Sequence, residues 1–188
     1  MNIFSVEWAS DSLKVCILSD THRYLDPRVE RMAFGSDLIV HCGDLMGGEV
    51  LRQLHGLSDH VVAVAGNNDT AAIWPPDEID QVRALPQSVI IELPGGSVAV
   101  EHGHHWGNHP PHAKLRDQYP EARLIAYGHT HLQVLDQTDK PWVLNPGAAG
   151  RTRTHGGASC ALLNIRNATS WEIELIKFAE IVDKTQSA

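Results

Sequence analysis

The chain has 188 residues, a length that suits one domain with a sizeable hydrophobic core. Its formal net charge of −8 argues against broad nucleic-acid binding, which needs a basic face, and no apolar run reaches the roughly 18–20 residues that span a bilayer. The first residues lack the apolar core of a secretory signal, and the three cysteines show no CxxC spacing, so we expect a cytoplasmic protein with reduced thiols.

Short apolar, β-branched runs recur along the chain, and the segments between them have the character of helices or loops. Near-continuous apolar runs of this length are typical of strands that are buried on both faces. In chain order, we expect such strands at residues 15–18, 38–40, 61–64, 98–100 and 124–126. Helical spacing of apolar residues predicts helices at residues 27–34, 48–57 and 110–119.

The last third of the chain changes character. Residues 142–144, 159–165 and 170–176 predict strands joined by tight turns, which we expect to form an antiparallel addition. The pattern therefore starts as βαβ units and ends as a β meander, which indicates an α/β fold. We expect a single domain over residues 1–188, with residues 1–12 as an N-terminal extension.

A polar cluster follows each of the first five apolar runs. The clusters are DTH at 20–22, GD at 43–44, GNND at 66–69, HGH at 102–104 and GHTH at 128–131. In an open α/β sheet the loops at the strand C-termini converge on one edge, so these segments should meet in one crevice. Each cluster alone is typical of a turn or an ion pair, but five at successive strand ends favour a metal site.

The donor types indicate which ions this site would bind. Carboxylate, amide and imidazole donors without thiolate favour Mn²⁺, the ion we expect first, with Fe²⁺, Zn²⁺, Ni²⁺ and Co²⁺ as alternatives. The donors outnumber those that one ion uses, so we expect two divalent metal ions. Two dications about 3.5–4 Å apart repel strongly and need a shared anion, for which Asp44 is the natural bridge.

In this order, the motifs resemble those of the calcineurin-like metallophosphoesterases, whose pattern runs D-x-H, G-D, G-N-H-[D/E], a strand-end His and G-H-x-H. The similarity covers residues 15–147, ends in an N-P-G turn at 145–147, and is greatest to the small bacterial and archaeal phosphodiesterases, relatives of the retromer scaffold subunit. It implies an αββα sandwich of two mixed β-sheets flanked by helices, with the site at the carboxyl edge of the strands.

The resemblance also implies which residues bind the two ions. By position, the ligands of the first ion would be Asp20, His22, Asp44 and His131. By the same comparison, the ligands of the second ion would be Asp44, Asn67, His102 and His129. A hydroxide bridging the ions would attack phosphorus, so the implied activity is the hydrolysis of small phosphodiesters.

One position departs from the family pattern. Asn68 stands where most members have a histidine that is thought to protonate the leaving oxygen, and an amide cannot do this at a useful pH. We therefore expect diesters with good leaving groups to be preferred, with Asn68 near the reacting substrate. His104 is the best substitute proton donor, although a role in orienting its loop explains it equally well. Arg151 is a candidate phosphate contact, for which a surface arginine is the alternative.

Other functions remain open at this point. The resemblance allows a catalytically weak or inactive protein-binding scaffold with the same fold, which the intact ligand set argues against, and a phosphomonoesterase. We expect the partner to be a small phosphoester, with no membrane and no broad nucleic-acid binding, and a homo-oligomer is left open. The remaining histidines of residues 105–112 are favoured as a solvated loop, and Trp74 as a packed loop anchor.

Overall fold

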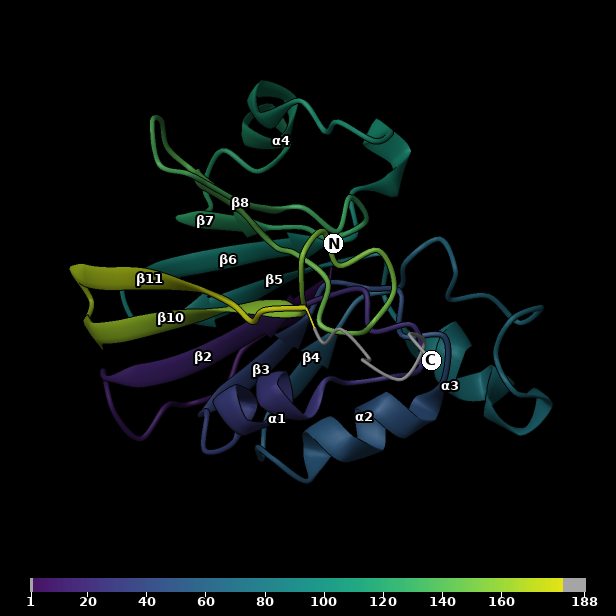
Figure 1. Cartoon of the computed structure of the whole chain (residues 1–188). Helices are drawn as coiled ribbons and strands as arrows, with labels where there is room; N and C mark the ends of the chain where they lie inside the picture. Colours follow the sequence, from purple (N-terminus) through teal and green to yellow (C-terminus); the bar gives the residue numbers. More distant parts are fainter. Residues whose placement is uncertain (1, 181–188) are drawn as a thin grey trace.

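The computed structural model describes residues 2–180 and contains two β-sheets packed face to face, with helices on both outer faces (Figure 1). The strands of the first sheet are β2 (Leu13–Leu18), β3 (Leu38–His41), β4 (Val61–Ala63), β10 (Ser159–Asn167) and β11 (Ser170–Lys177). The strands of the second sheet are β1 (Asn2–Phe4), β5 (Ser88–Leu93), β6 (Gly96–Glu101), β7 (Leu124–Ala126), β8 (Gln133–Asp136) and β9 (Trp142–Pro146).

Both sheets are mixed. The first has the strand order β11-β10-β2-β3-β4, and the second has the order β1-β5-β6-β7-β9-β8. Strands β2, β3 and β4 are parallel, as are β6, β7 and β9, while β10 and β5 run antiparallel to their neighbours β2 and β6. The expected sandwich of two mixed sheets between layers of helices is therefore confirmed.

The helices are short and belong to the two outer layers. They are α1 (Pro27–Ala33), α2 (Gly48–His55), α3 (Ile79–Ala84) and α4 (His112–Gln118), with 3-10 turns at Pro76–Glu78 and His104–Trp106. Side chains of α1, α2 and α3 pack on the first sheet, and α4 packs on the second, on the opposite side of the molecule (Figure 1). None of the helices in the described part of the chain is long and apolar enough to cross a membrane.

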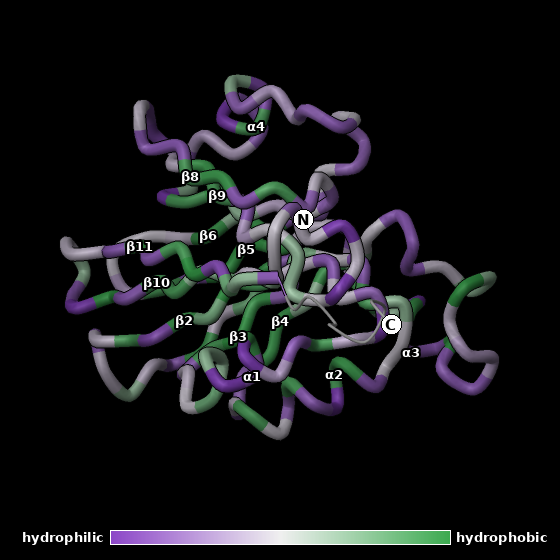
Figure 2. The backbone as a smooth tube through the Cα atoms, in the orientation of Figure 1, coloured by the Kyte–Doolittle hydropathy of each residue, from purple (hydrophilic) through white to green (hydrophobic). Residues whose placement is uncertain are grey.

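The central strand β2 shows why its last four residues are all apolar. Val15 and Ile17 are fully buried between the two sheets, whereas Cys16 and Leu18 are buried against the helices of the outer face. Burial of each such aliphatic side chain contributes about 1.5–3 kcal/mol. Hydrophobic (green) segments run mainly through the strands in the middle of the molecule, and hydrophilic (purple) segments lie mainly toward its periphery (Figure 2).

Five strands and helices differ from the expected set. Strands β1, β5 and β8 and helix α3 were not predicted, and β9 joins the second sheet beside β7 instead of extending an antiparallel meander. Strand β5 alternates more and less buried side chains, which differs from the continuous apolar runs that indicated the other strands. Only the β10–β11 hairpin forms the expected antiparallel addition, beside β2.

The N-terminal residues contribute to the second sheet. Strand β1 pairs in parallel with β5, and the indole Nε1 of Trp8 donates a hydrogen bond of 3.1 Å to the carbonyl of Glu92. The segment that we expected to be an extension therefore includes an edge strand, because its backbone groups find partners in a hairpin about ninety residues further along the chain.

Candidate metal centre

The five polar clusters follow strands of both sheets. Asp20, Asp44 and Asn67 follow β2, β3 and β4 of the first sheet, whereas His102 and His129 follow β6 and β7 of the second. Contacts such as the 3.0 Å hydrogen bond from His129 N to Oδ2 of Asp20 show that the loops from the two sheets meet. The site thus lies where the carboxyl ends of two packed sheets come together, instead of at the edge of one open sheet.

The backbone of these loops is held in a conformation that L-residues rarely adopt. Five predicted ligands have positive φ values: Asp20 (53°), His22 (46°), Asp44 (60°), His129 (67°) and His131 (59°). This left-handed conformation costs roughly 1–2 kcal/mol per residue, so tertiary contacts must maintain it. Backbone hydrogen bonds of 3.0 Å from Asp20 N to Gly43 O and from His22 N to Asp44 O connect the first two loops.

Two glycines allow the loops to approach so closely. A Cβ atom at Gly66 would lie 2.1 Å from Oδ1 of Asp44, and one at Gly128 would lie 2.9 Å from Oδ2 of Asp20. Real Cβ atoms do not come this close to other heavy atoms, so these positions require glycine for steric reasons. The glycines of the sequence motifs therefore make room for the carboxylates.

Asp20, His22 and His131 form a first group of potential metal ligands. The distance from Nε2 of His131 to Oδ1 of Asp20 is 3.2 Å, and the distance to Nε2 of His22 is also 3.2 Å. Nδ1 of His131 donates to the carbonyl of Thr152 over 2.8 Å, which leaves the lone pair of Nε2 facing the group. This is the tautomer that a metal-ligating histidine needs.

Asp20, Asp44 and His102 form a second group. Nδ1 of His102 donates to the carbonyl of Cys42 over 2.7 Å, so its Nε2 lone pair faces Oδ1 of Asp44 at 3.4 Å and Oδ1 of Asp20 at 4.0 Å. Oδ1 of Asp20 and Nε2 of His102 are buried without a hydrogen-bond partner in the part of the chain that the structure describes. Two buried, unsatisfied electron-pair donors facing one another fit a cation between them.

The carboxylates of the site are ionised. Burial alone would raise the pKa of Asp44, but His102 and Asn68 outweigh it and hold the pKa well below its usual range. Burial is similarly outweighed by His131 and His102 at Asp20, whose pKa is also lowered. Burial lowers the pKa of His22, which keeps its imidazole neutral. The site therefore offers negative oxygens and a neutral nitrogen of His22, as divalent ions require. At His102 burial would lower the pKa, but Asp44 and Asp20 outweigh it and raise the pKa.

Asp44 faces one histidine of each predicted shell. Its Oδ1 lies 3.4 Å from Nε2 of His102, and its Oδ2 lies 3.7 Å from Nε2 of His22. Asp20, however, is the carboxylate that the two groups of ligands share. Asn67 and His129 lie together, with 3.0 Å between Oδ1 and Nδ1, and the His129 ring is 5.3 Å from the His102 ring. The structure thus brings all seven predicted ligands into one neighbourhood.

Asn68 contacts the predicted bridging carboxylate. Its backbone N–H donates to Oδ1 of Asp44 over 2.8 Å, and its side-chain Nδ2 donates to Oδ2 over 2.7 Å. Asn68 therefore orients Asp44 through both oxygens. An amide can keep this contact with a carboxylate, whereas it cannot supply a proton to a leaving oxygen.

His104 lies at the site and Arg151 lies away from it. The His104 ring is 5.5 Å from the His102 ring, and its buried Nδ1 has no partner among residues 2–180. Burial lowers the pKa of His104, so the neutral ring dominates at pH 7 and is a weak proton donor. The guanidinium of Arg151 stacks 3.5 Å above the ring of Tyr24. Both roles stay predictions.

Three residues near the site were missed from the sequence. The Asp69 carboxylate accepts hydrogen bonds from the backbone of residues 44–46 and 66 and from Nε1 of Trp74. Trp74 is therefore a packed anchor, as expected.

The buried His41 is the second missed residue. Its Nδ1 accepts a hydrogen bond from Gly43 N, its Nε2 contacts Oγ1 of Thr21, and burial lowers its pKa to about 4. Nothing in the sequence distinguishes His41.

The third missed residue is Arg153. One terminal nitrogen of its guanidinium lies 3.0 Å from Nε2 of His131, whereas the guanidinium of Arg151 stacks on the ring of Tyr24. Two arginines alternate with threonines at residues 151–154, and nothing in that pattern distinguishes Arg153 from Arg151.

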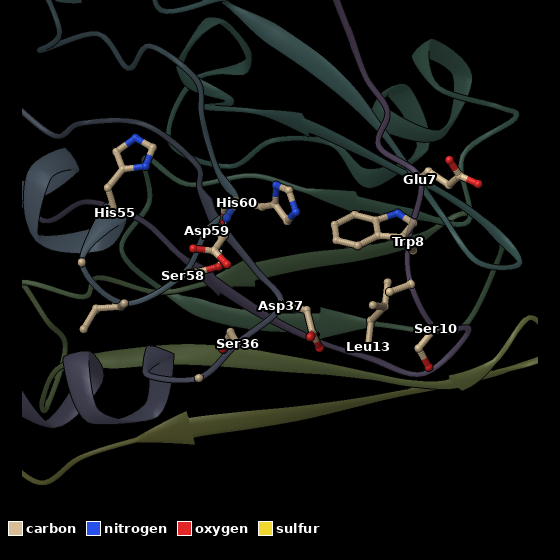
Figure 3. Close-up of a pocket in the computed structure, with 14 residues that line it drawn as sticks. Glu7, Trp8, Ser10, Leu13, Ser36, Asp37, His55, Ser58, Asp59 and His60 are labelled. Atoms are coloured by element: carbon tan, nitrogen blue, oxygen red, sulfur yellow. Dashed lines mark hydrogen bonds between the residues drawn. The ribbon is translucent and has the colours of Figure 1, made fainter.

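A cavity of about 500 Å³ lies away from this centre (Figure 3). Its lining includes Leu13 at the start of β2, Asp37 just before β3 and His60 just before β4. Trp8 packs edge-on against His60, with 5.3 Å between the ring centroids. These three strands are parallel and the ligands follow their carboxyl ends, so the cavity is at the opposite end of the sheet and plays no part in the site.

Metal removal tests the centre directly. Adding Mn²⁺ to metal-free protein should raise its melting temperature, because the ion pairs with Oδ1 of Asp20 and Nε2 of His102. A free ion concentration of 100 times Kd adds about 2.7 kcal/mol to the unfolding free energy, or about 5–10 °C. Circular dichroism melts in EDTA and after addition of Mn²⁺ measure the shift. Asp20→Asn should lose most of it, and an unchanged wild-type melting temperature would contradict a metal site.

Known proteins provide an independent comparison. The sequence model of the calcineurin-like phosphoesterase superfamily domain matches residues 13–168. A phosphodiesterase of Methanocaldococcus jannaschii is 28% identical over 143 residues, which cover 72% of this chain and 83% of that protein. Phosphodiesterase YfcE of Escherichia coli K12 is 27% identical over 176 residues, which cover 81% of this chain and 88% of that protein.

Solved structures share the fold. Wild-type Vps29 of Entamoeba histolytica, crystallised with Zn²⁺, matches with a TM-score of 0.66 and 20% sequence identity. The match covers 88% of this chain and 99% of the Vps29 chain. At this identity the similarity shows the fold alone.

Proposed function

The chain belongs to the calcineurin-like phosphoesterase superfamily, and on that premise we propose that it is a phosphodiesterase that hydrolyses small diesters with two divalent ions. The family binds divalent metals, and the resemblance to the small bacterial and archaeal phosphodiesterases is confirmed by curated relatives with that name. The proposal adds the number of ions, the diester preference and the residues that act.

The observation that carries the proposal is a pair of buried donors, Oδ1 of Asp20 and Nε2 of His102, that have no hydrogen-bond partner within residues 2–180. They lie among carboxylates, imidazoles and an amide, with no thiolate, a set that suits Mn²⁺ first and Fe²⁺, Zn²⁺, Ni²⁺ or Co²⁺ as alternatives. Bound divalent ions would polarise phosphoryl oxygens and lower the pKa of water enough to give a nucleophile near neutral pH.

The two proposed shells follow the family pattern. The first ion takes Asp20, His22, Asp44 and His131. The second ion takes Asp44, Asn67, His102 and His129. The two oxygens of Asp44 face opposite shells, and this arrangement supports Asp44 as the bridge.

The residues beside the shells support a diesterase that depends on its leaving group. Asn68 is engaged with Asp44 and has no proton to give, and His104 is held neutral by its surroundings. General acid catalysis is typically worth 10²–10⁴-fold, and its loss slows poor leaving groups most. Aryl diesters do not need this assistance, because an aryl oxide leaves without prior protonation.

A substrate panel tests the proposed function. With added Mn²⁺, kcat/KM for an aryl phosphodiester should exceed that for an alkyl phosphomonoester by at least about 10²-fold, the lower end of what a missing general acid costs. The panel includes an aryl monoester and 2′,3′-cyclic nucleotides, and metal analysis of the same sample gives the ion content. Equal turnover of alkyl monoesters and aryl diesters would favour a phosphomonoesterase. The Asn68→His variant is part of the same experiment and should reduce the dependence of rate on leaving-group pKa, provided that its metal content is unchanged.

A protein-binding scaffold is the second candidate. The fold similarity to Vps29 favours it, whereas the complete set of donors in this chain favours the enzyme. The substrate panel described for the enzyme also distinguishes the two functions, because a scaffold would fold and bind ions without hydrolysing any of the esters.

We also propose a cytoplasmic protein, because Cys16, Cys42 and Cys160 are all buried and free. The single domain over residues 1–188, the small phosphoester as partner and a homo-oligomeric state stay predictions. Analytical ultracentrifugation of the full chain measures the last of these.

A further inference from the structure

A basic loop passes beside the metal centre. Residues 150–157 contain two arginines and one histidine and no carboxylate, in a chain whose net charge is −8. A Cβ atom at Gly150 would lie 2.4 Å from the carbonyl oxygen of Thr21, and one at Gly157, where φ is +136°, would collide with the carbonyl of Phe178. Both ends of the loop are therefore held tightly against neighbouring segments, so the positions of its arginines are defined by the fold.

The two arginines of this loop face different surroundings. Arg151 lies over Tyr24 and lines a cavity of about 340 Å³ together with Asp26 and Arg28. That cavity includes none of the predicted metal ligands. The terminal nitrogen of Arg153, in contrast, lies 3.0 Å from Nε2 of His131.

Arg153 occupies the lone pair that a metal ion would use. Nδ1 of His131 donates to the carbonyl of Thr152, so Nε2 accepts from the Arg153 guanidinium. A metal–imidazole bond is about 2.0–2.1 Å long, so the same lone pair cannot serve both partners. A dication and a guanidinium also repel each other at this separation. Binding of an ion to His131 therefore displaces Arg153.

The displaced guanidinium has few alternatives within the protein. Arg153 is exposed, and in residues 2–180 it pairs with no carboxylate. Its backbone φ of +49° is part of a loop that is anchored through Thr152 to His131, so the side chain stays beside the ions after it leaves Nε2. A planar guanidinium in this position matches the oxygens of a phosphoryl group, to which it donates two parallel hydrogen bonds.

We propose that Arg153 is a substrate-binding residue: the ion at His131 displaces its guanidinium, which then donates to a phosphoryl oxygen of the substrate. This inference rests on the proposed function. It gives Arg153 the phosphate contact that the sequence had suggested for Arg151. Loss of the Arg153 side chain should therefore strengthen metal binding and weaken phosphate binding.

The test compares Arg153→Gln with Arg151→Gln, which removes the same charge from the same loop. Calorimetry measures the Kd of the metal-free proteins for Mn²⁺, and product inhibition of the Mn²⁺-loaded proteins gives the inhibition constant of inorganic phosphate. Arg153→Gln should bind Mn²⁺ about threefold to tenfold more tightly, because a competing cation is gone. It should bind phosphate about tenfold or more weakly, because a charge-assisted hydrogen bond is lost. Arg151→Gln should change either constant less than about twofold, because screening by solvent weakens the effect of a more distant charge.

Arg153→Lys refines the comparison. Lysine keeps the positive charge but loses the planar pair of donors, so Mn²⁺ affinity should stay close to that of the wild type while phosphate binding weakens about threefold or more. Circular dichroism spectra of all three variants should match the wild type, since both arginines are exposed.

The outcomes separate this inference from the function on which it rests. If the wild type binds Mn²⁺ and hydrolyses diesters but Arg153→Gln has an unchanged inhibition constant for phosphate, the role of Arg153 is wrong and the proposed function stands. Equal effects of Arg151→Gln and Arg153→Gln would assign them to the net charge of the loop and would also overturn the inference. A wild-type protein that neither binds Mn²⁺ nor turns over any ester overturns both.

Discussion

Replacing Asp44 with asparagine is expected to lower kcat/KM for an aryl phosphodiester by about 10³-fold and to reduce the bound metal. The Asp44 side chain is almost fully buried, with one oxygen 3.4 Å from Nε2 of His102 and the other 3.7 Å from Nε2 of His22. Neutralising it removes an anion whose two oxygens face the two proposed shells, and leaves Asp20 as the carboxylate that the two groups share. Metal ions contribute several kcal/mol to the reaction, and each 1.36 kcal/mol is about a factor of ten in rate.

Steady-state kinetics together with metal analysis of the purified variant check this expectation. Asp80→Asn is the matched control, because it makes the same chemical change at a carboxylate whose side chain is 99% exposed. The control should keep wild-type activity and metal content. An Asp44→Asn protein that hydrolyses the diester at the wild-type rate would rule out Asp44 as the bridging ligand.

Asp69→Ala should lower the free energy of unfolding by about 4 kcal/mol. The carboxylate accepts five hydrogen bonds, from the backbone N–H groups of residues 44, 45, 46 and 66 and from Nε1 of Trp74. Each buried donor left without a partner costs about 1–3 kcal/mol, and water entering the vacated space recovers part of the total. For a domain of this size, the melting temperature should fall by roughly 10 °C.

Urea and thermal unfolding in EDTA measure this effect without a contribution from bound metal. Trp74→Phe deletes one of the five hydrogen bonds and keeps a large apolar ring, so it should cost about 1 kcal/mol. If Asp69→Ala were no less stable than Trp74→Phe, the backbone contacts of Asp69 would not be what holds the Asp44 loop. Because the Asp44 loop carries the proposed bridging carboxylate, we also expect Asp69→Ala to lose the thermal shift that is expected on addition of Mn²⁺.

Much of the fold could be predicted because the relevant patterns are local. Strands β2, β3 and β7 appear where continuous apolar runs predict them, since residues on both faces of each strand are buried. Helix α1 begins where Asp26 caps its first turn and Pro27 follows. Such signals reside within a few residues of sequence and need no knowledge of the neighbouring strand.

The pairing of strands could not be read in the same way. Strand β9 lies beside β7 in the second sheet, and β1 lies beside β5. Nothing in the local sequence of either strand indicates which strand it pairs with. Pairing depends on which backbone groups become neighbours after the chain has folded. The predicted ligands likewise come from loops of two sheets, and the order of the motifs along the chain does not indicate this.

The sequence by itself determined the family and the types of donor at the ends of the strands, because those residues are consecutive with the strands that position them. Tertiary structure alone decided how each donor is presented. Nδ1 of His102 is taken by the carbonyl of Cys42, sixty residues away, which directs the other nitrogen toward Asp44. Asn68 is held on Asp44 across twenty-four residues, and Arg153, not Arg151, reaches His131. Hydrogen-bond partners of this kind are far apart in the chain. The tautomer of His102, the orientation of Asp44 and the contact of Arg153 with His131 are therefore defined only once the two sheets are packed.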